Sequence, residues 1–407
     1  MFPLTEDKFL LDFLGKTLLE RQVETARQAG INEFVFVASP ANRARIEEVT
    51  GRLRGIKVSI IVQEQPLGMA DAILSAASLL DSEVIIVNPN DIFDGSGYAL
   101  LKEARQSGDA VSYVLAKKVQ TYFPGGYLVT DDRGFLRQIV EKPGQGKEPS
   151  NMVNLVVHLH SDPERLLHAI RQEPAGEDDV YERALTALAH SDRVKVVAYG
   201  GHWTAIKYPW HILDAVRYFL DKEPPRISPT ASVSPSATID GRVTIAENAR
   251  ILENAVVRGP AYIGRNTVIG NNSLVRDYSH IGDDCVIGFS TEIKDSYVGN
   301  RCWTHMNYLG DSIVGEDCSF GAGTITANWR LDAKNIPVKI NGKPVGTGRD
   351  KFGAIIGNHC KTGVSVSIMP GVKMGPDALI GPGVVVTTDV GPGERRLTGR
   401  KLYRRKK

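Results

Sequence analysis

A chain of 407 residues is too long for one ordinary hydrophobic core, so we expect at least two domains. Hydrophobic residues make up 42% and charged residues 24%, which is typical of a folded globular protein and excludes a disordered or collagen-like chain. The formal net charge of +2 hides an uneven distribution, because residues 395–407 hold eight cations and no acid, leaving 41 cations and 47 acids elsewhere. This acidic body excludes a protein that coats nucleic acid, and the basic end is predicted to be a solvated tail.

The cysteines and the apolar runs predict the compartment. Four cysteines lie in the second half of the chain, without the C-x-x-C pairs or histidine spacing typical of zinc sites: Cys285, Cys302, Cys318 and Cys360. Buried, reduced thiols are therefore expected. No apolar run approaches the ~20 residues that a membrane helix requires, and the N-terminus lacks the pattern of a signal peptide. The sequence predicts a cytoplasmic protein with no membrane partner.

The first half alternates helical patterns with short β-branched strands. The predicted helices span 18–29, 70–80 and 211–220, and the predicted strands span 33–37, 58–62 and 83–87. Such alternation indicates a mainly parallel sheet covered by helices on both faces, with ligands bound beyond the carboxyl ends of the strands. The segment 221–225, which ends in two prolines, is predicted to be a linker.

After this linker the hydrophobic period becomes six residues. Twelve consecutive sixth positions are aliphatic: Ile227, Val233, Ile239, Ile245, Ile251, Val257, Ile263, Ile269, Val275, Ile281, Ile287 and Ile293. The register slips after Ile293, is interrupted over 329–352, and returns with Thr362 as one polar inward position. Neither helices nor ordinary strands produce this spacing, whereas a parallel β-helix with three faces does. A flat side of such a solenoid invites self-association.

Two motifs in the second half carry a family resemblance. The segment 304–312 reads T-H-M-N-Y-L-G-D-S, and 320–328 reads F-G-A-G-T-I-T-A-N. With the hexapeptide period, they resemble the left-handed β-helix acyltransferases, and within these the acetyltransferase half of bifunctional sugar-phosphate enzymes. The resemblance implies a homotrimer that binds acetyl-CoA between neighbouring coils and acetylates glucosamine-1-phosphate or galactosamine-1-phosphate.

His305 is the candidate base of that reaction. An amino sugar is mostly ammonium near neutral pH, so its attack on a thioester needs a base, and histidine suits this task. The resemblance further implies residues that bind the acceptor sugar phosphate, namely Arg276, Lys294, Tyr308, Asn328 and Lys334. It places acetyl-CoA beside Ala322 and Gly363.

The first half resembles the sugar-1-phosphate nucleotidylyltransferases. The segment 63–72 reads Q-E-Q-P-L-G-M-A-D-A and looks like that family's base-reading element. The resemblance implies that Gln63 reads the imide edge of uracil or thymine, that Gly68 lets the base approach the backbone, and that Asp91 binds Mg²⁺. It also implies sugar and phosphate contacts from Gly126, Glu141, Lys142 and Asn154.

The first half of the chain departs from the nucleotidylyltransferase motifs in two places. The family opens with a strand and the loop L-A-A-G-x-G-x-R directly before an M-x-P-L-T element, and this chain begins at Met1 inside that element. The family's W-x-D-I-G-x-P element is present over 203–209 with Ala205 at the position of the aspartate. Either the true start lies upstream, which we favour, or the domain binds a sugar nucleotide without turning it over.

The sequence thus predicts an α/β plus all-β protein. A Rossmann-like nucleotide-diphospho-sugar transferase domain (1–222) precedes a left-handed parallel β-helix of hexapeptide repeats (223–394) and a basic tail (395–407). The predicted function is bifunctional: N-acetylation of an amino-sugar-1-phosphate by acetyl-CoA, and transfer of a nucleotidyl group from UTP or dTTP to a sugar-1-phosphate. Two alternatives are a glucose-1-phosphate thymidylyltransferase with an inert solenoid, and a non-catalytic subunit that binds sugar nucleotides.

Overall fold

The computed structural model describes residues 1–65, 67–174 and 179–397, so most of the predicted basic tail lies outside the described residues. The chain forms two compact units: Leu18–Ala205, here called the sheet unit, and Met1–Thr17 together with the chain from Ile206 onward, here called the solenoid unit. These units differ from the domains predicted from the linker, which divide after Lys222. The last helix before the linker is joined to the solenoid by ion pairs of Arg217 with Asp295 and of Asp214 with Arg349, and Met1–Thr17 by the ring of Phe13.

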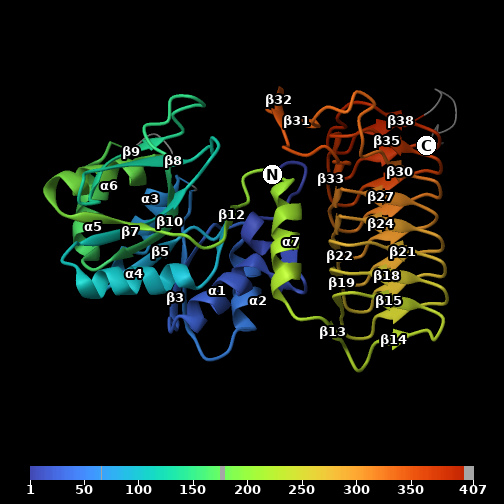
Figure 1. Cartoon of the computed structure of the whole chain (residues 1–407), viewed down its shortest axis with the longest axis horizontal. Coiled ribbons are helices and arrows are strands. Elements are labelled where there is room, and N and C mark those ends of the chain that lie inside the picture. The colour runs from blue at the N-terminus through green and yellow to red at the C-terminus, as the bar shows by residue number, and fades with distance from the viewer. Residues whose placement is uncertain (66, 175–178, 398–407) are drawn as a thin grey trace. The chain divides into compact units, whose positions relative to one another are not determined.

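The sheet unit contains the predicted helices 18–29 and 70–80 and the three predicted strands, and the third predicted helix, 211–220, belongs to the solenoid unit (Figure 1). Its helices are α1 (Leu18–Gln28), α2 (Arg43–Gly51), α3 (Met69–Ser75), α4 (Ser96–Ser107), α5 (Pro163–Gln172) and α6 (Val180–Ser191). Its strands are β3 (Glu33–Ala38), β4 (Lys57–Val62), β5 (Val84–Val87), β6 (Asp91–Phe93), β7 (Ser112–Lys118), β8 (Gly126–Thr130), β9 (Leu136–Glu141), β10 (Met152–His160), β11 (Val194–Ala198) and β12 (Trp203–Ala205). A short 3-10 helix, Ala77–Leu79, ends the predicted helix 70–80.

The main sheet has the strand order β11-β7-β10-β8-β9, and β5 also pairs with β10. The expectation of a mainly parallel sheet is wrong, since β7–β11 and β3–β4 are parallel whereas β10 pairs antiparallel with β5, β7 and β8. Strand β9 follows β8 without a crossover helix and pairs with it antiparallel, as a strand that returns directly does. Among the described residues, β3 pairs with β4 alone and β5 with β10 alone.

Helices cover both faces of this sheet, as predicted. Alternate residues of β7 enter different cores, because successive side chains of a strand point to opposite faces. Val114 and Ala116 pack in the core that includes α5 and α6, whereas Tyr113 and Leu115 pack in the core that includes α4.

The solenoid unit is a parallel β-solenoid with three faces of stacked short strands (Figure 1). Face A consists of β13 (Arg226–Ile227), β16 (Val243–Ile245), β19 (Ala261–Ile263), β22 (Ser279–Ile281), β25 (Tyr297–Val298), β28 (Ile313–Val314), β33 (Ile355–Ile356) and β36 (Lys373–Met374). Face B consists of β14 (Ser232–Val233), β17 (Arg250–Ile251), β20 (Val268–Ile269), β23 (Val286–Ile287), β26 (Trp303–Thr304), β29 (Ser319–Phe320), β34 (Lys361–Thr362), β37 (Leu379–Ile380) and β39 (Arg395–Arg396). Face C consists of β15 (Thr238–Asp240), β18 (Val256–Arg258), β21 (Leu274–Val275), β24 (Glu292–Lys294), β27 (Tyr308–Gly310), β30 (Ile325–Thr326), β35 (Ser367–Ile368) and β38 (Val385–Val386).

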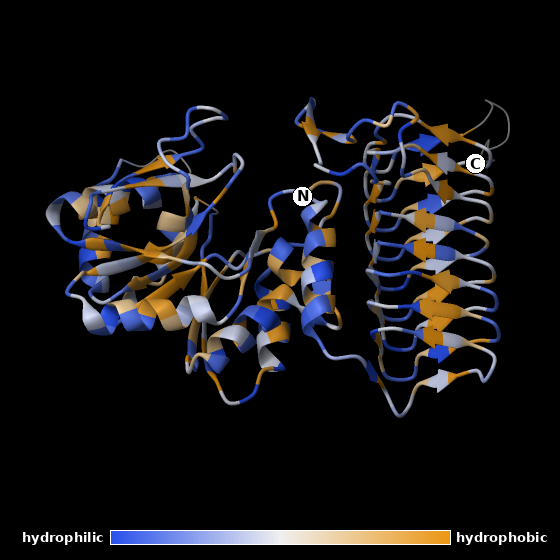
Figure 2. Cartoon of the chain, in the orientation of Figure 1, coloured by the Kyte–Doolittle hydropathy of each residue, from blue (hydrophilic) through white to orange (hydrophobic). Residues whose placement is uncertain are grey.

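The residues predicted to point inward form the solenoid core, and Figure 2 shows apolar residues along its strands. From Ile245 to Ile293 every sixth residue is buried. Ile227 is 48% exposed because it belongs to the first coil, which has no coil beneath it. The polar inward residue Thr362 is accommodated by a hydrogen bond of 2.9 Å with the hydroxyl of Thr324.

The predicted slip is a shortening of the coil. Val257 pairs with Val275 and Val275 with Ile293, which keeps one constant spacing from coil to coil. Ile293 then pairs with Leu309, which comes earlier in the chain than that spacing would place it, so the turn between them is shorter. The interruption that follows contains a hairpin of β31 (Pro337–Ile340) and β32 (Lys343–Gly346).

The four cysteines are free and buried, as predicted. Each thiol donates a hydrogen bond to a glycine carbonyl of the next coil, at 3.1–3.2 Å. They are therefore part of the coil-to-coil packing. No described helix is long and apolar enough to cross a membrane.

The N-terminal segment and α7 (His211–Lys222) complete the solenoid unit. Phe13, in the short strand β1 (Asp12–Phe13) that pairs with β2 (Lys16–Thr17), is fully buried. Its ring centroid lies 5.4 Å from that of Phe219 in α7 and 6.1 Å from that of Tyr297 on face A. Aromatic contact thus joins all three parts.

We predict that Phe13→Ala lowers the free energy of unfolding by about 3–5 kcal/mol, because truncating a fully buried Phe removes apolar contact and leaves a cavity. Chemical denaturation followed by circular dichroism measures the change. The control is Phe2→Ala, since Phe2 is 45% exposed and should cost far less. Equal effects of the two substitutions would contradict the assignment of this segment to the solenoid core.

Candidate functional site

His305 lies at the corner between faces B and C, after β26 and before β27. Its side chain is exposed, and its backbone N–H donates to Oδ1 of Asn307. Asn307 is itself buried and donates from Nδ2 to the carbonyl of Gly321 in the next coil, at 2.8 Å. Gly288 of the preceding coil lies next to His305, and a Cβ atom on this glycine would lie 3.5 Å from Nδ1 of His305. The corner therefore fixes the backbone of His305 and leaves its imidazole accessible.

Three of the five predicted acceptor residues form one cluster on face C. Lys294 Nζ donates to both carboxylate oxygens of Asp311, at 2.8 and 2.9 Å. The amide Nδ2 of Asn328 donates to Asp311 and, at 3.0 Å, to the hydroxyl oxygen of Tyr308. Burial raises the pKa of the Tyr308 phenol, so this hydroxyl keeps its proton.

Asp311 is the residue that sequence reasoning missed. It is 2% exposed and binds both Lys294 and Asn328, so it sets the orientation of two predicted ligands at once. It lies within the motif 304–312, but nothing in that motif indicates its partners. Its partners lie on the neighbouring coils, so the motif alone does not reveal them.

The other two predicted acceptor residues bind neighbours outside this cluster. Arg276 pairs with Glu292 at 3.0 Å, and Glu292 lies beside Tyr308 in the ladder of face C. Lys334 is exposed in the interruption that follows Asn328, and its backbone N–H lies 3.4 Å from Oδ1 of Asp332.

The two residues predicted to bind acetyl-CoA, Ala322 and Gly363, lie on the next two coils after His305, at the same corner between faces B and C. Gly323 donates its N–H to the carbonyl of Met306 at 2.9 Å, and Ser365 donates to the carbonyl of Ala322 at 2.8 Å. A Cβ atom on Gly321 would lie 2.5 Å from the backbone of Gly363, so successive coils touch here. These corners expose Phe289, Met306 and Val364.

In the sheet unit, the predicted base-reading residues lie together. The side-chain amide of Gln63 donates to Oδ2 of Asp71 at 2.7 Å and to the carbonyl of Gly68 at 3.2 Å. Gly68 has a φ of +98°, which glycine tolerates far better than residues with a side chain.

The predicted sugar and phosphate residues also converge. Gly126 is the register partner of Glu141, and a Cβ atom on Gly126 would lie 3.0 Å from Oε2 of Glu141 and 3.5 Å from Cβ of Asn154. Lys142 pairs with Glu141 at 3.2 Å. Three adjacent strands, β8, β9 and β10, thus bring these four residues to one place.

Asp91, the predicted Mg²⁺ ligand, is buried at the start of β6. Its Oδ1 accepts a hydrogen bond from Trp203 Nε1 at 3.1 Å, and its register partner in β12 is Ala205. The described residues contain no group of three or more His, Cys, Asp or Glu side chains arranged around a cation. One carboxylate fits the usual binding of Mg²⁺, in which substrate phosphates and water complete the shell.

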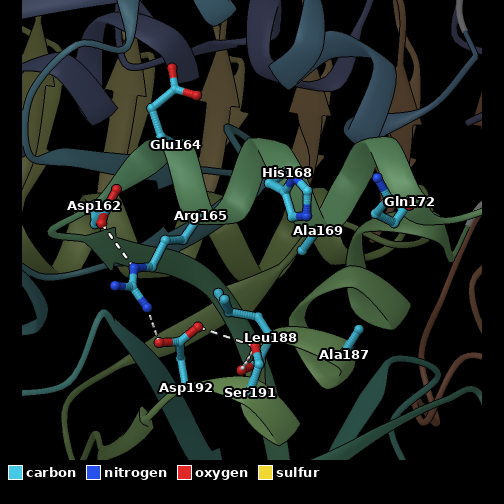
Figure 3. A pocket seen from close by; sticks show the side chains of 10 residues that line it. All are labelled: Asp162, Glu164, Arg165, His168, Ala169, Gln172, Ala187, Leu188, Ser191 and Asp192. Carbon is cyan, nitrogen blue, oxygen red and sulfur yellow. Dashed lines mark hydrogen bonds and ion pairs between the residues drawn. The ribbon is translucent and has the colours of Figure 1, made fainter.

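Figure 3 shows a surface pocket between α5 and α6 that contains none of the predicted site residues. Its arginine, Arg165, is paired with Asp162 at 3.0 Å and also with Asp192. These two carboxylates neutralise the guanidinium, so the pocket offers an anion no free positive charge.

Comparison with known proteins matches both units. The nucleotidyl transferase family matches residues 1–206, and the bacterial transferase hexapeptide family matches 242–277, 260–295 and 353–388. A protein of Sulfurisphaera tokodaii named bifunctional sugar-1-phosphate nucleotidylyltransferase/acetyltransferase is 35% identical, over 96% of this chain and 94% of the relative. Proteins named bifunctional protein GlmU are 35% identical in Methanococcus maripaludis strain C7 and 31% identical in Methanococcus vannielii, each over 96% of this chain and 92% of the relative.

We predict that Ala205→Asp makes folding stability depend on Mg²⁺. An aspartate opposite Asp91 places two like charges on neighbouring strands, so in EDTA the free energy of unfolding should fall by about 1–3 kcal/mol. Mg²⁺ should restore it by neutralising the pair, as thermal denaturation with and without the cation would measure. Ala205→Asn is the matched control without the charge, and equal Mg²⁺ responses from both variants would contradict a cation site at Asp91.

Proposed function

The chain belongs to the family of bifunctional sugar-1-phosphate nucleotidylyltransferases and acetyltransferases, and we propose that it performs both transfers itself. The solenoid unit would move the acetyl group of acetyl-CoA to the amine of glucosamine-1-phosphate or galactosamine-1-phosphate. The sheet unit would join a sugar-1-phosphate to the nucleotidyl group of UTP or dTTP. The observation that carries the proposal is the accessible imidazole of His305 on the coils that also hold the Lys294–Asp311–Asn328–Tyr308 cluster.

His305 acts as the base in the acetyl transfer. The amine of the sugar attacks the thioester carbonyl, so a C–N bond forms while the C–S bond breaks and coenzyme A leaves. The imidazole takes the proton that the amine loses. The held backbone and the free side chain of His305 suit this role, since the base must reach a substrate that arrives from outside the coil.

The face C cluster binds the acceptor. Lys294 uses two of its three ammonium hydrogens on Asp311, so one remains for a phosphate or sugar oxygen. Asn328 and Tyr308 supply an amide oxygen and a hydroxyl beside it. Arg276 and Lys334 add positive charge for the phosphate.

Acetyl-CoA binds along the corner of Ala322 and Gly363, between neighbouring copies of a homotrimer. The exposed apolar side chains at this corner, Phe289, Met306 and Val364, support such an interface, because exposed apolar groups gain by contact. The cytoplasmic location remains a prediction from the sequence.

In the sheet unit, Gln63 and Gly68 receive the base, and Gly126, Glu141, Lys142 and Asn154 receive the sugar and its phosphate. Asp91 would hold Mg²⁺, which supplies charge neutralisation at the phosphates when bound. Ala205 opposite Asp91 favours one alternative, a sheet unit that binds a sugar nucleotide without turnover. A glucose-1-phosphate thymidylyltransferase with an inert solenoid is the other, and an active His305 would exclude it.

We predict that His305→Ala lowers the rate of acetyl transfer on the order of 10²–10⁴-fold, the usual contribution of a positioned base. The measurement is release of the coenzyme A thiol with each amino-sugar-1-phosphate as acceptor. His359→Ala is the matched control, since His359 is also exposed on the solenoid but has no assigned role. Wild-type protein that is folded and trimeric, yet releases no thiol with either acceptor, would refute the acetyltransferase.

We also predict that Asp311→Asn raises the KM for the amino-sugar-1-phosphate about tenfold, because it weakens the charge-assisted hydrogen bonds that orient Lys294 and Asn328. The KM for acetyl-CoA should change little. Initial-rate kinetics in both substrates separates the two. Asp240→Asn, at an exposed position in the first coil of the solenoid, controls for the loss of charge, and equal effects of the two variants would contradict the role of Asp311.

A further inference from the structure

A continuous chain of buried polar side chains runs through the sheet unit and ends at Asn154. Ser112 Oγ lies 2.7 Å from Nδ1 of His160, and Nε2 of His160 lies 3.2 Å from the hydroxyl of Tyr181. That hydroxyl lies 2.7 Å from Nδ1 of His158, whose Nε2 lies 2.8 Å from Oδ1 of Asn154. The two histidines are completely buried.

The strand geometry explains how this chain closes. His158 and His160 are two residues apart in β10, so both point to the same face of the sheet, toward α6 and Tyr181. The pairing of β10 with β7 shifts register between Asn154 and His158. This bulge re-aims the side chains, so Asn154 contacts His158 further along the same strand.

Both imidazoles are neutral. Burial lowers the pKa of His158 well below its usual range and that of His160 to about 3. A neutral imidazole has one N–H donor and one acceptor nitrogen, so the hydrogen bond at Asn154 fixes the direction of the other three. With Oδ1 of Asn154 as acceptor, Ser112 donates to His160, His160 to Tyr181, Tyr181 to His158, and His158 Nε2–H to Asn154.

This direction determines what Asn154 can offer a ligand. Its carbonyl oxygen is used by His158, so its amide Nδ2 carries the donors that remain. The side chain starts beside Gly126 and Glu141, where the sugar and its phosphate are proposed to bind. If the hydrogen bonds ran in the opposite direction, the amide oxygen of Asn154 would face the ligand and would bind a hydroxyl donor of the ligand.

We propose that Ser112, His160, Tyr181 and His158 are positioning residues that hold the carboxamide of Asn154 with its amide hydrogens toward an oxygen of the sugar-1-phosphate. The proposal rests on the proposed sugar site of the sheet unit. Aliphatic side chains could fill this core without the cost of burying so many polar groups, so packing alone does not account for the chain. The need to orient the Asn154 carboxamide accounts for these buried polar side chains.

The test is a double-mutant cycle on the full-length protein. Tyr181→Phe removes the one hydroxyl that links the two histidines and keeps the ring. Tyr113→Phe is the matched control, since Tyr113 is equally buried in the same unit and its hydroxyl accepts a hydrogen bond from the N–H of Ala110, outside the chain. Each is measured alone and together with Asn154→Ala, with the KM for sugar-1-phosphate, the KM for UTP and kcat as readouts.

Tyr181→Phe is expected to raise the KM for sugar-1-phosphate about five- to twentyfold, the cost of a misdirected hydrogen bond, without changing the KM for UTP. In the Asn154→Ala background the same substitution should have no further effect on it, because the chain acts through that residue. Tyr113→Phe should leave both KM values unchanged in either background, even if both hydroxyl losses lower the melting temperature alike.

The wild-type protein separates failure of this proposal from failure of the proposed function. If it turns over, equal sugar KM values in the two Tyr→Phe variants, or an equal effect of Tyr181→Phe with and without Asn154, would overturn the positioning role alone. If it binds a UDP-sugar without turnover, the same comparison is made on the Kd from calorimetry. If it neither binds nor reacts, the sugar site itself is refuted and the positioning role with it.

Discussion

The closed coil of the solenoid is the constraint on which its site depends. An inward aliphatic residue at every sixth position forces the chain around three faces, so residues one full coil apart in sequence become neighbours in space. This geometry turns residues from separate coils into one surface: Lys294, Asp311 and Asn328 meet although each belongs to a different turn. The imidazole of His305 is presented at a corner that the same packing holds in place.

The six-residue period predicts the solenoid core because every inward position has one environment, a dry interior shared with the coils above and below. The cluster around Asp311 could not be predicted in this way. The slip of the period after Ile293 predicts an irregular coil there, but it does not show which side chains of the neighbouring coils lie beside Asp311. Family resemblance found Lys294, Tyr308 and Asn328 individually, and only the fold shows the carboxylate between them.

In the sheet unit, local elements could be predicted from the sequence but long-range pairing could not. Local patterns predict the elements 18–29, 33–37, 58–62, 70–80 and 83–87 of this unit, since apolar periodicity and the glycine after α1, with a φ of +81°, act within a few residues. Strand pairing is a long-range property, so the antiparallel neighbours of β10 could not be deduced from alternation of helix and strand. The polar chain behind Asn154 was equally hidden, because Ser112 and Tyr181 come from other elements than β10.

The division of the chain into units has a topological consequence. The solenoid unit begins before Leu18 and resumes at Ile206, so the sheet unit is an insertion whose two ends are both anchored in the same body. A solenoid expressed from the linker onward would lose Phe13 and Phe219. The ring of Tyr297, which Phe13 contacts, would then be exposed as part of an apolar surface that favours aggregation. A single cut at the linker therefore divides the solenoid unit, because Met1–Thr17 and α7 belong to it.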